Sequence, residues 1–235
     1  ATLIRTPAWI VVALSAVMGV LAISSRASTA RFWFKYVAGD DGMPVFLFLD
    51  RFGLFLTALA LGQVSGVILG YLLQRRFEKS HLLMTGGAIK VVGIAIFYLL
   101  PLDAVWLQTL AQYGVGVGFG MLMVLSFSMF TDIAEYIDWK NGQQMTGLVV
   151  SASIFAVKIG MGLGGALPGF VLSLTGFDPA AEQSAEALAG IDFAFAVMPV
   201  LILLPAGLAL TFYRLDRRTI AQVETELAQR RDSPV

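Results

Sequence analysis

The feature that most constrains this chain is a series of long apolar runs with few or no charged residues. The uncharged runs lie at about residues 7–25, 52–74, 104–131 and 193–213, and two further runs, 82–100 and 147–174, each contain a single lysine. A helix needs about 20 apolar residues, at about 1.5 Å per residue, to cross the hydrocarbon core of a bilayer. The runs therefore predict an all-α integral membrane protein with six transmembrane helices.

The composition supports this class and excludes others. Hydrophobic residues make up 57% of the chain and charged residues 14%, whereas an average soluble domain has about 25% charged residues. Sixteen basic residues balance sixteen acidic ones, so the charge gives no reason to expect a nucleic-acid partner. The chain has no cysteine and only one histidine, which excludes thiolate and histidine-cluster metal sites. We expect the lipid bilayer as a partner, and no metal or cofactor.

The basic residues predict how the spans are oriented. Residues 1–214 form the expected six-helix bundle, and residues 215–235 form a basic tail that we expect to be an amphipathic surface helix. Ten of the sixteen basic residues fall on one side of the six spans, in loops and in this tail. Because basic loops stay on the cytoplasmic side, both termini are predicted to be cytoplasmic. Arg26, Arg31 and Lys35 fall in a polar connection on the other side.

Lys158 lies in the middle of the fifth run, at membrane depth. A charge there costs about 2.5–3.5 kcal/mol, and a lysine stem cannot reach the headgroups from the centre of a span. Ser151 and Gly165 lie seven residues to either side, which gives a narrow polar and small face that can line a water-filled path. A structural lysine–carboxylate pair is the alternative. For Lys90, about 12 Å into the third span by helical rise, we favour snorkelling over a functional role.

Glycines at spacings of four predict close helix packing. The second run contains Gly62, Gly66 and Gly70, and small residues at this spacing let helices approach closely in lipid. The fifth run contains two such pairs, which are Gly160 with Gly164, and Gly165 with Gly169. The glycines also match a dinucleotide-binding pattern, but that pattern needs a preceding strand and does not function inside an apolar helix.

An acidic cluster follows the fourth run. Asp132, Glu135 and Asp138 are three residues apart, so they share one face if the helix continues, and Lys140 follows them. We consider a solvated cap and a cytoplasmic gate in which the acids pair with Lys140 or with a basic loop elsewhere. Carboxylates can also perform acid–base chemistry, but no nucleophile with an adjacent base accompanies them. An enzyme is not expected.

Three stretches of the chain form a recognisable pattern, and they are the run from Asp132 to Lys140 with Gly142, the run from Lys158 to Gly169, and the connection from Phe34 to Asp40. Together they resemble the glycoside-pentoside-hexuronide:cation symporters, a branch of the major facilitator superfamily. The order of the acids departs from the family pattern, because Glu135 stands where aspartate is usual and Asp138 where glutamate is usual. In the second loop, Glu78 replaces a glycine.

The resemblance implies that the chain is the C-terminal half of a major-facilitator-type transporter in the cell inner membrane, built as two three-helix inverted repeats. The implied activity is secondary active transport of a sugar or glycoside, coupled to Na⁺ or H⁺ by alternating access. The coupling-cation site would lie mainly in an N-terminal six-helix half that this sequence lacks. A non-transporting membrane scaffold or regulatory module is the alternative function.

The resemblance also implies roles for individual residues. Lys158 matches a lysine that faces the central cavity, and Ser151 shares its face. Arg26 and Tyr36 match polar positions near the outer end of the first helix. Asp132, Glu135 and Asp138 match acids of the cytoplasmic gate, with Lys140 beside them.

Overall fold

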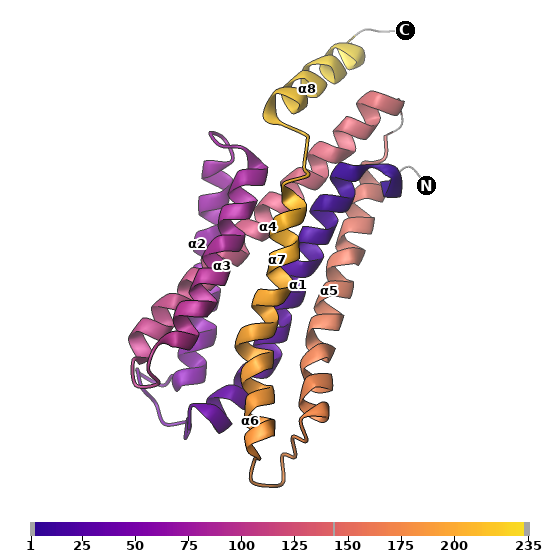
Figure 1. Cartoon of the computed structure of the whole chain (residues 1–235). Coiled ribbons are helices and arrows are strands. Elements are labelled where there is room, and N and C mark those ends of the chain that lie inside the picture. The colour runs from indigo at the N-terminus through magenta and orange to yellow at the C-terminus, as the bar shows by residue number, and fades with distance from the viewer. Residues whose placement is uncertain (1–2, 143, 233–235) are drawn as a thin grey trace.

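The chain folds into a bundle of helices, and no strand occurs in the part of the chain that the structure describes. The computed structural model describes residues 3–142 and 144–232 (Figure 1). After a 3₁₀ turn at Leu3–Arg5, the elements are α1 (Pro7–Phe32), a π-helical turn at Trp33–Val37, α2 (Arg51–Leu73), α3 (Lys79–Leu99), α4 (Val105–Asn141), α5 (Thr146–Leu174), α6 (Ala185–Asp192), a second π-helical turn at Phe193–Val197, α7 (Met198–Leu210) and α8 (Arg217–Asp232).

Local sequence explains several helix ends. Pro7 occupies the first turn of α1, where its missing N–H is not needed. Asp50 caps α2 because its carboxylate accepts a hydrogen bond of 2.7 Å from the Gly53 N–H. Gly142 ends α4 with a φ of +63°, a left-handed conformation that glycine adopts without a steric penalty. Local sequence signals of this kind mark where these helices begin and end.

Six of the described helical segments are long and apolar enough to cross a membrane, which confirms the predicted fold class. Their bounds differ from the predicted ones by more than three residues at three places. The first helix continues past Arg26 to Phe32 and into the π-helical turn, and the last begins at Ala185 rather than 193. The fourth continues through the acidic cluster to Asn141. The predicted bounds were placed at the charged residues that end each apolar run. A helix can extend past such residues, because its backbone hydrogen bonds do not depend on apolar side chains.

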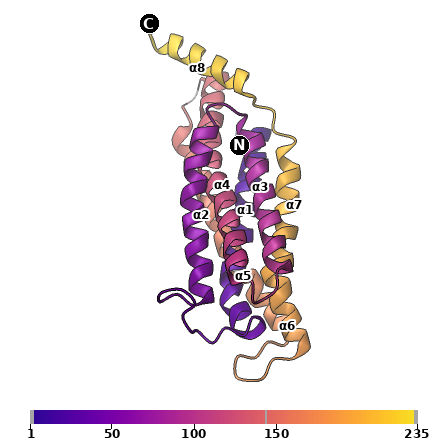
Figure 2. The same cartoon turned by 90° about the vertical axis from the view of Figure 1, so that its left-hand side faces the viewer.

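The helices form two groups around α1 and α4. α1 packs mainly against α5 and α7, whereas α4 packs mainly against α2 and α3, and α1 and α4 contact each other. Figure 2 shows α2 beside α4 along most of its length, with α8 lying across one end of the bundle. Both termini lie at this same end (Figure 1), as an even number of spans requires.

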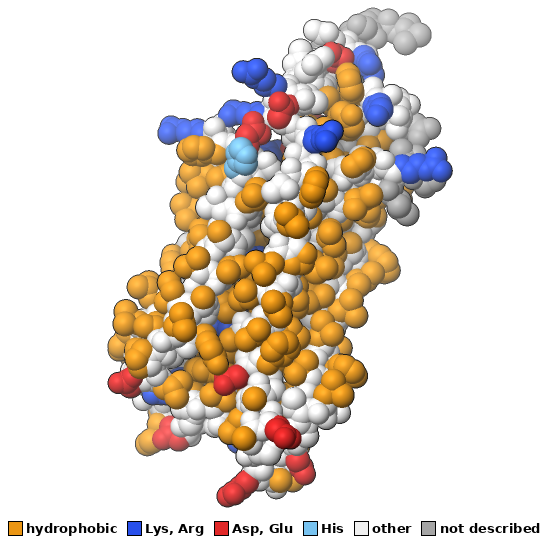
Figure 3. Space-filling view, viewed as in Figure 1, with side chains coloured by type: hydrophobic (Ala, Val, Ile, Leu, Met, Phe, Trp, Pro, Cys, Tyr) orange, Lys and Arg blue, Asp and Glu red, His pale blue; other side chains and the backbone are white. Residues whose placement is uncertain are grey.

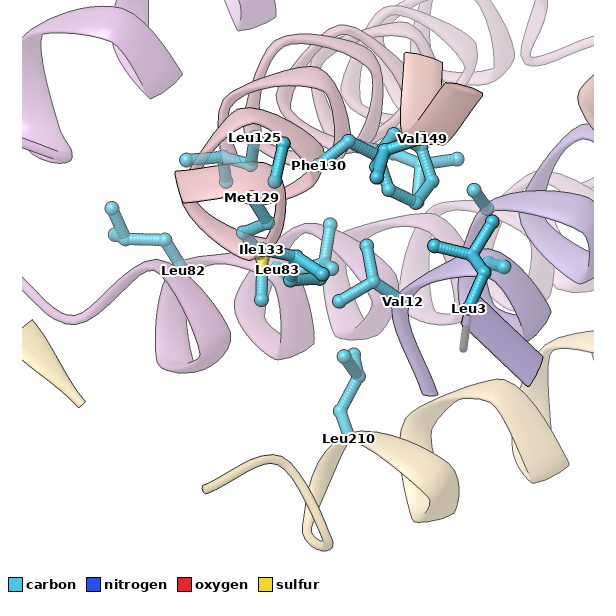
Figure 4. Close-up of a cluster of buried hydrophobic side chains, with 14 of the residues drawn as sticks. Leu3, Val12, Leu82, Leu83, Leu125, Met129, Phe130, Ile133, Val149 and Leu210 are labelled. Carbon is cyan, nitrogen blue, oxygen red and sulfur yellow. The ribbon is translucent and has the colours of Figure 1, made fainter. Parts of the chain in front are cut away.

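Buried hydrophobic side chains among the described residues form three clusters, and the two larger ones lie towards opposite ends of the bundle. Near the termini, α4 contributes Leu125, Met129, Phe130 and Ile133, which meet side chains from α1, α3, α5 and α7 (Figure 4). Towards the opposite end the core is aromatic, and it includes Trp33, Phe34, Phe55, Phe97 and Phe195. These rings lie 4.7–6.4 Å apart where they meet, so they form one continuous cluster.

The surface is divided into an apolar band and two charged ends. On the face in Figure 3, hydrophobic side chains cover the middle of the bundle, lysine and arginine gather near the termini, and acidic residues predominate at the other end. We call the end with the termini the basic end. This distribution is the one expected for helices that cross a bilayer.

Candidate functional site

Lys158 lies on the most open helix of the bundle. In the apolar stretch of α5 that could span a membrane, 22% of the residues are buried. The corresponding share is 56% for α1 and for α4. Lys158 itself is exposed, and the described residues place no hydrogen-bond or ion-pair partner on it. Ser151, one and a half to two turns away, is exposed as well. The alternative of a structural lysine–carboxylate pair is therefore not found within the described part of this chain.

The glycines of α5 divide between two faces. A β-carbon at Gly160 would lie 2.7 Å from the Val17 carbonyl oxygen, and one at Gly164 would lie 2.5 Å from that of Leu21, so both glycines allow α1 to approach. Gly165 and Gly169 are exposed and have no neighbour within 4 Å. Helix packing at these two glycines therefore stays a prediction, because no helix of this chain contacts them and residue 165 is rotated about 100° from residue 164.

Gly162, Gly165 and Gly169 share the open face with Ser151 and Lys158. We call these five residues the open face of α5. By helical rotation they fall within about 60° of one another, opposite the side that contacts α1. The face therefore combines one ammonium, one hydroxyl and a surface without side chains, at the depth of the apolar band. Such a surface is unsuited to lipid tails, because nothing there compensates the charge.

Lys90 does not snorkel. Its side chain is 2% exposed and packs against Gly118 of α4, and its Nζ would lie 3.3 Å from a β-carbon at Gly19 in the middle of α1. The interpretation that its stem reaches back to the basic loop is therefore wrong. Glycine on both neighbouring helices provides the space that lets the long side chain point inward instead.

Arg26 is buried inside the bundle rather than in a polar connection. Its guanidinium carbon lies 4.0 Å from the centre of the Phe195 ring and 4.8 Å from that of Phe97. It donates to the Phe195 carbonyl oxygen at 2.9 Å and to Gln112 Oε1 at 3.4 Å. Aromatic faces and two oxygens thus stabilise the charge. Arg26 is wholly buried and Lys158 exposed, so the two do not share one surface.

Tyr36 lies near the end of the bundle opposite the termini. Its ring contacts Phe177, which follows α5, at a centroid distance of 5.5 Å, and its hydroxyl accepts a hydrogen bond of 3.1 Å from Lys35. Phe177 follows the end of α5 at Leu174, which lies 16 residues beyond Lys158, about 24 Å by helical rise. The structure therefore does not bring Tyr36 and Lys158 together.

The acidic cluster is part of α4, and its first member is paired. Asp132 is nearly buried and accepts two hydrogen bonds, of 2.6 and 2.8 Å, from the Lys79 ammonium at the start of α3. Of the partners considered, it is the basic loop rather than Lys140 that pairs with Asp132. Tyr213 lies near this pair, and burial, together with the charges of Asp132 and Glu78, raises the pKa of its phenol.

The other members face the surface at the basic end. Glu135 and Asp138 are half-buried, and Lys140 is exposed with its Nζ 5.9 Å from the Tyr136 ring centre. These residues lie on the part of α4 that continues beyond the apolar run. Because the helix continues, the three-residue spacing places Glu135 and Asp138 on one side of it. No group of three or more acidic or histidine side chains among the residues described could hold a metal ion.

The basic tail forms α8, which docks on the end of α4. Ile220, Val223 and Leu227 form its buried stripe, while its arginines are exposed where they are described. The Trp139 indole N–H donates to Glu226 at 2.6 Å, and Arg230 donates to the Trp139 carbonyl at 3.0 Å. Hydrogen bonds from Gln222 and Trp139 lower the pKa of the Glu226 carboxyl.

Sequence reasoning missed two residues of these networks. Lys79 was not distinguished from the other basic residues of its loop. The signal for it was Asp132, because a nearly buried carboxylate requires a cation as its partner. Gln112 is a fully buried amide within an apolar span and accepts from Arg26. An amide at that depth is itself a signal, because a buried polar group requires a partner.

The sequence matches known transporters along nearly its whole length. The family described as MFS/sugar transport protein matches residues 2–217. The isoprimeverose transporter of Lactiplantibacillus pentosus is 30% identical over 94% of this chain and 45% of its own length. The inner membrane symporter YicJ of Escherichia coli (strain K12) is 26% identical over 94% of this chain and 47% of its own. The chain spans about half the length of these relatives.

Solved structures share the fold. A D-xylose–proton symporter superimposes with a TM-score of 0.66 at 16% identity, over 95% of this chain and 52% of that one. The structure of tetrameric PepTSo2 gives a TM-score of 0.64, also at 16% identity, over 96% of this chain and 47% of that one. At this identity the likeness concerns the fold alone. Together with the family match over residues 2–217, the six spans show that this chain belongs to the sugar-transport branch of the major facilitator superfamily formed by the glycoside-pentoside-hexuronide:cation symporters.

Proposed function

We propose that this chain is the C-terminal half of a symporter that carries a sugar or glycoside together with Na⁺ or H⁺. Three observations support the proposal: the family membership, the half-length match to its relatives, and the open face of α5. An N-terminal six-helix half would cover that face, and the central path would lie between the halves. The excess of basic residues at the basic end supports a cytoplasmic position for both termini in the cell inner membrane.

The open face of α5 carries the argument. An exposed ammonium at the middle of a spanning helix needs water, a carboxylate or a sugar hydroxyl as its partner. The glycines beside Lys158 leave room for a ligand or for the backbone of another helix. Lys158 would then interact with the substrate or with the coupling-cation carboxylates, and Ser151 would add a hydroxyl to the same path.

The test is sugar uptake by the full-length protein carrying Lys158→Ala. We expect uptake to fall at least tenfold while the amount of protein in the membrane stays normal. Leu163→Ala is the matched control, because Leu163 is also exposed on α5 but is rotated by about 140° from Lys158. Undiminished uptake by the Lys158 variant would refute its role in the path.

The acids of α4 are proposed to act in the cytoplasmic gate. The Lys79–Asp132 pair ties α3 to α4 at the basic end, and Glu135, Asp138 and Lys140 continue the same helix towards α8. Alternating access requires contacts at this end to break and form in each cycle. Neutralising Asp132 and Glu135 together should therefore change the transport rate more than the sugar affinity. A collapse of binding with an unchanged rate would place these acids in the substrate site.

A further inference from the structure

A cavity lies at the basic end, away from the open face of α5. Its volume is about 840 Å³, and three segments form its wall. These are the start of α1, the last turns of α4, and the segment that follows α7. The lining residues are Arg5, Thr6, Pro7, Ala8, Tyr136, Ile137, Lys140, Asn141, Phe212, Arg214 and Leu215.

The charge of this cavity is entirely positive. Arg5, Lys140 and Arg214 line it, and none of its lining residues is acidic. All three cations are exposed, and no salt bridge within 4.0 Å neutralises any of them among the described residues. Lys79, by contrast, is paired with Asp132 at the same end. Three like charges around one cavity repel each other, and an anion bound between them would remove that repulsion.

Thr6, Tyr136 and Asn141 add polar groups to the wall, and its remaining residues are apolar and lie at the depth of the membrane surface. Pro7 begins the first spanning helix, and Phe212 and Leu215 follow the last one within five residues of Leu210. Ile137 adds an apolar side chain from α4. A free phosphate would satisfy the cations but would leave this apolar part facing water. A lipid satisfies both, since its headgroup is anionic and the chains below it are apolar.

We propose that this cavity binds the phosphate group of an anionic phospholipid from the leaflet at the basic end. Arg5, Lys140 and Arg214 hold the phosphate, and the apolar residues contact the glycerol and the first carbons of the acyl chains. Basic pockets between spanning helices on the cytoplasmic side are suited to such headgroups. The site depends on the membrane setting of the bundle and not on the transport of any sugar.

The first test measures lipid binding to the purified full-length protein by native mass spectrometry, with phosphatidylglycerol titrated against phosphatidylcholine. We expect one tightly bound phosphatidylglycerol. The variant Arg5→Gln/Lys140→Gln/Arg214→Gln should weaken its binding at least tenfold. The matched control Arg75→Gln/Arg76→Gln/Arg218→Gln removes the same charge from exposed positions at the same end outside the cavity, and should change binding less than threefold.

Inorganic phosphate distinguishes a lipid from a free anion. Phosphate at millimolar concentration should not displace phosphatidylglycerol if the apolar wall contributes to binding. Displacement by phosphate, or phosphate binding that only the cavity variant loses, would assign the site to a soluble anion and overturn the lipid. Equal losses in the cavity and control variants would reduce the site to general surface charge and overturn it as well.

A second measurement needs no substitution, in case the triple variant does not fold. The unmodified protein is irradiated with a photoreactive phosphatidylglycerol in nanodiscs, and the labelled peptides are identified. We expect labels within residues 136–141 or 212–215. Labels confined to other parts of the surface would contradict the site.

Discussion

α2 and α5 are both edge helices with glycines at intervals of four, but they present opposite surfaces. On α2 the glycines face inward, where β-carbons at Gly62 and Gly66 would collide with the carbonyl oxygens of Tyr113 and Val117 of α4. Its outward side chains are large and apolar, such as Val64 and Ile68. On α5 one glycine pair faces inward, and the other lies outward beside Lys158. The comparison shows that α4 covers the glycines of α2, whereas the glycines on the open face of α5 have no neighbour within 4 Å in the described part of this chain.

The largest difference between the two helices should appear in stability. Gly66→Ala places a methyl group against the α4 backbone, which has no room to shift, and should destabilise the protein by about 3 kcal/mol or abolish folding. Gly165→Ala has open space around it and should change stability by less than about 0.5 kcal/mol. Thermal unfolding in detergent measures both. Equal effects would remove the distinction between the two glycine pairs.

The paired Lys79 and Lys158, which is unpaired within the described residues, extend this comparison between covered and open surfaces. Lys79→Met leaves the nearly buried Asp132 carboxylate without its partner and should cost about 2 kcal/mol of stability, because an uncompensated charge remains. Lys158→Met removes a charge that pairs with nothing in the described chain, and should leave the stability of this half unchanged. The double variant Lys79→Met/Asp132→Asn should recover part of the loss. A destabilised Lys158 variant would mean that this lysine has a structural partner.

A third prediction concerns transport rather than stability. Gly165→Phe fills the open face beside Lys158 and should lower uptake at least fivefold with normal membrane abundance. Leu163→Phe adds a similar ring to another exposed side of α5 and should have less than a twofold effect. If the two variants behave alike, the open face is no different from the lipid-facing surface.

The smallest effect should come from the contact between α8 and α4. The pKa of Glu226 is lowered in the folded state, so its contribution to docking is present above the ordinary glutamate pKa and is lost as the pH falls through the lowered value. Trp139 fluorescence in a variant without Trp9, Trp33 and Trp106 should therefore change below about pH 4.5. Glu226→Gln should remove this transition, and an unaltered transition would assign it to another group.

Apolar run length was enough to predict the six spans, because the thickness of the bilayer sets a minimum apolar length for every crossing helix. It was a poor guide to where the buried charges lie. Arg26 marked a helix end in the sequence, yet an aromatic cage lets α1 continue around it. Lys90 was expected to turn towards water, yet Gly19 and Gly118 leave it space inside. Both outcomes depend on neighbours from distant parts of the chain, and no local pattern contains that information.

The candidate site was also predictable from the sequence only in part. The spacing of Ser151, Lys158 and Gly165 predicts one shared face, since three residues on one helix are related by its rotation alone. The division of the α5 glycines between two faces follows from the same rotation, but which face α1 covers does not. Pairing of Asp132 with Lys79 joins residues 53 positions apart, and only the packing of α3 on α4 selects it from several basic candidates.

The continuity of α4 has a mechanical consequence. Its 37 residues form a single rod, about 55 Å long at about 1.5 Å per residue. A lever of that length converts a small rotation into a large displacement, so a tilt of about 5° around Val105 moves Trp139 by about 4 Å. Such a displacement exceeds the reach of the hydrogen bond between Trp139 and Glu226. In a variant without Trp9, Trp33 and Trp106, the Trp139 indole should therefore report optically on the angle of this helix relative to Glu226.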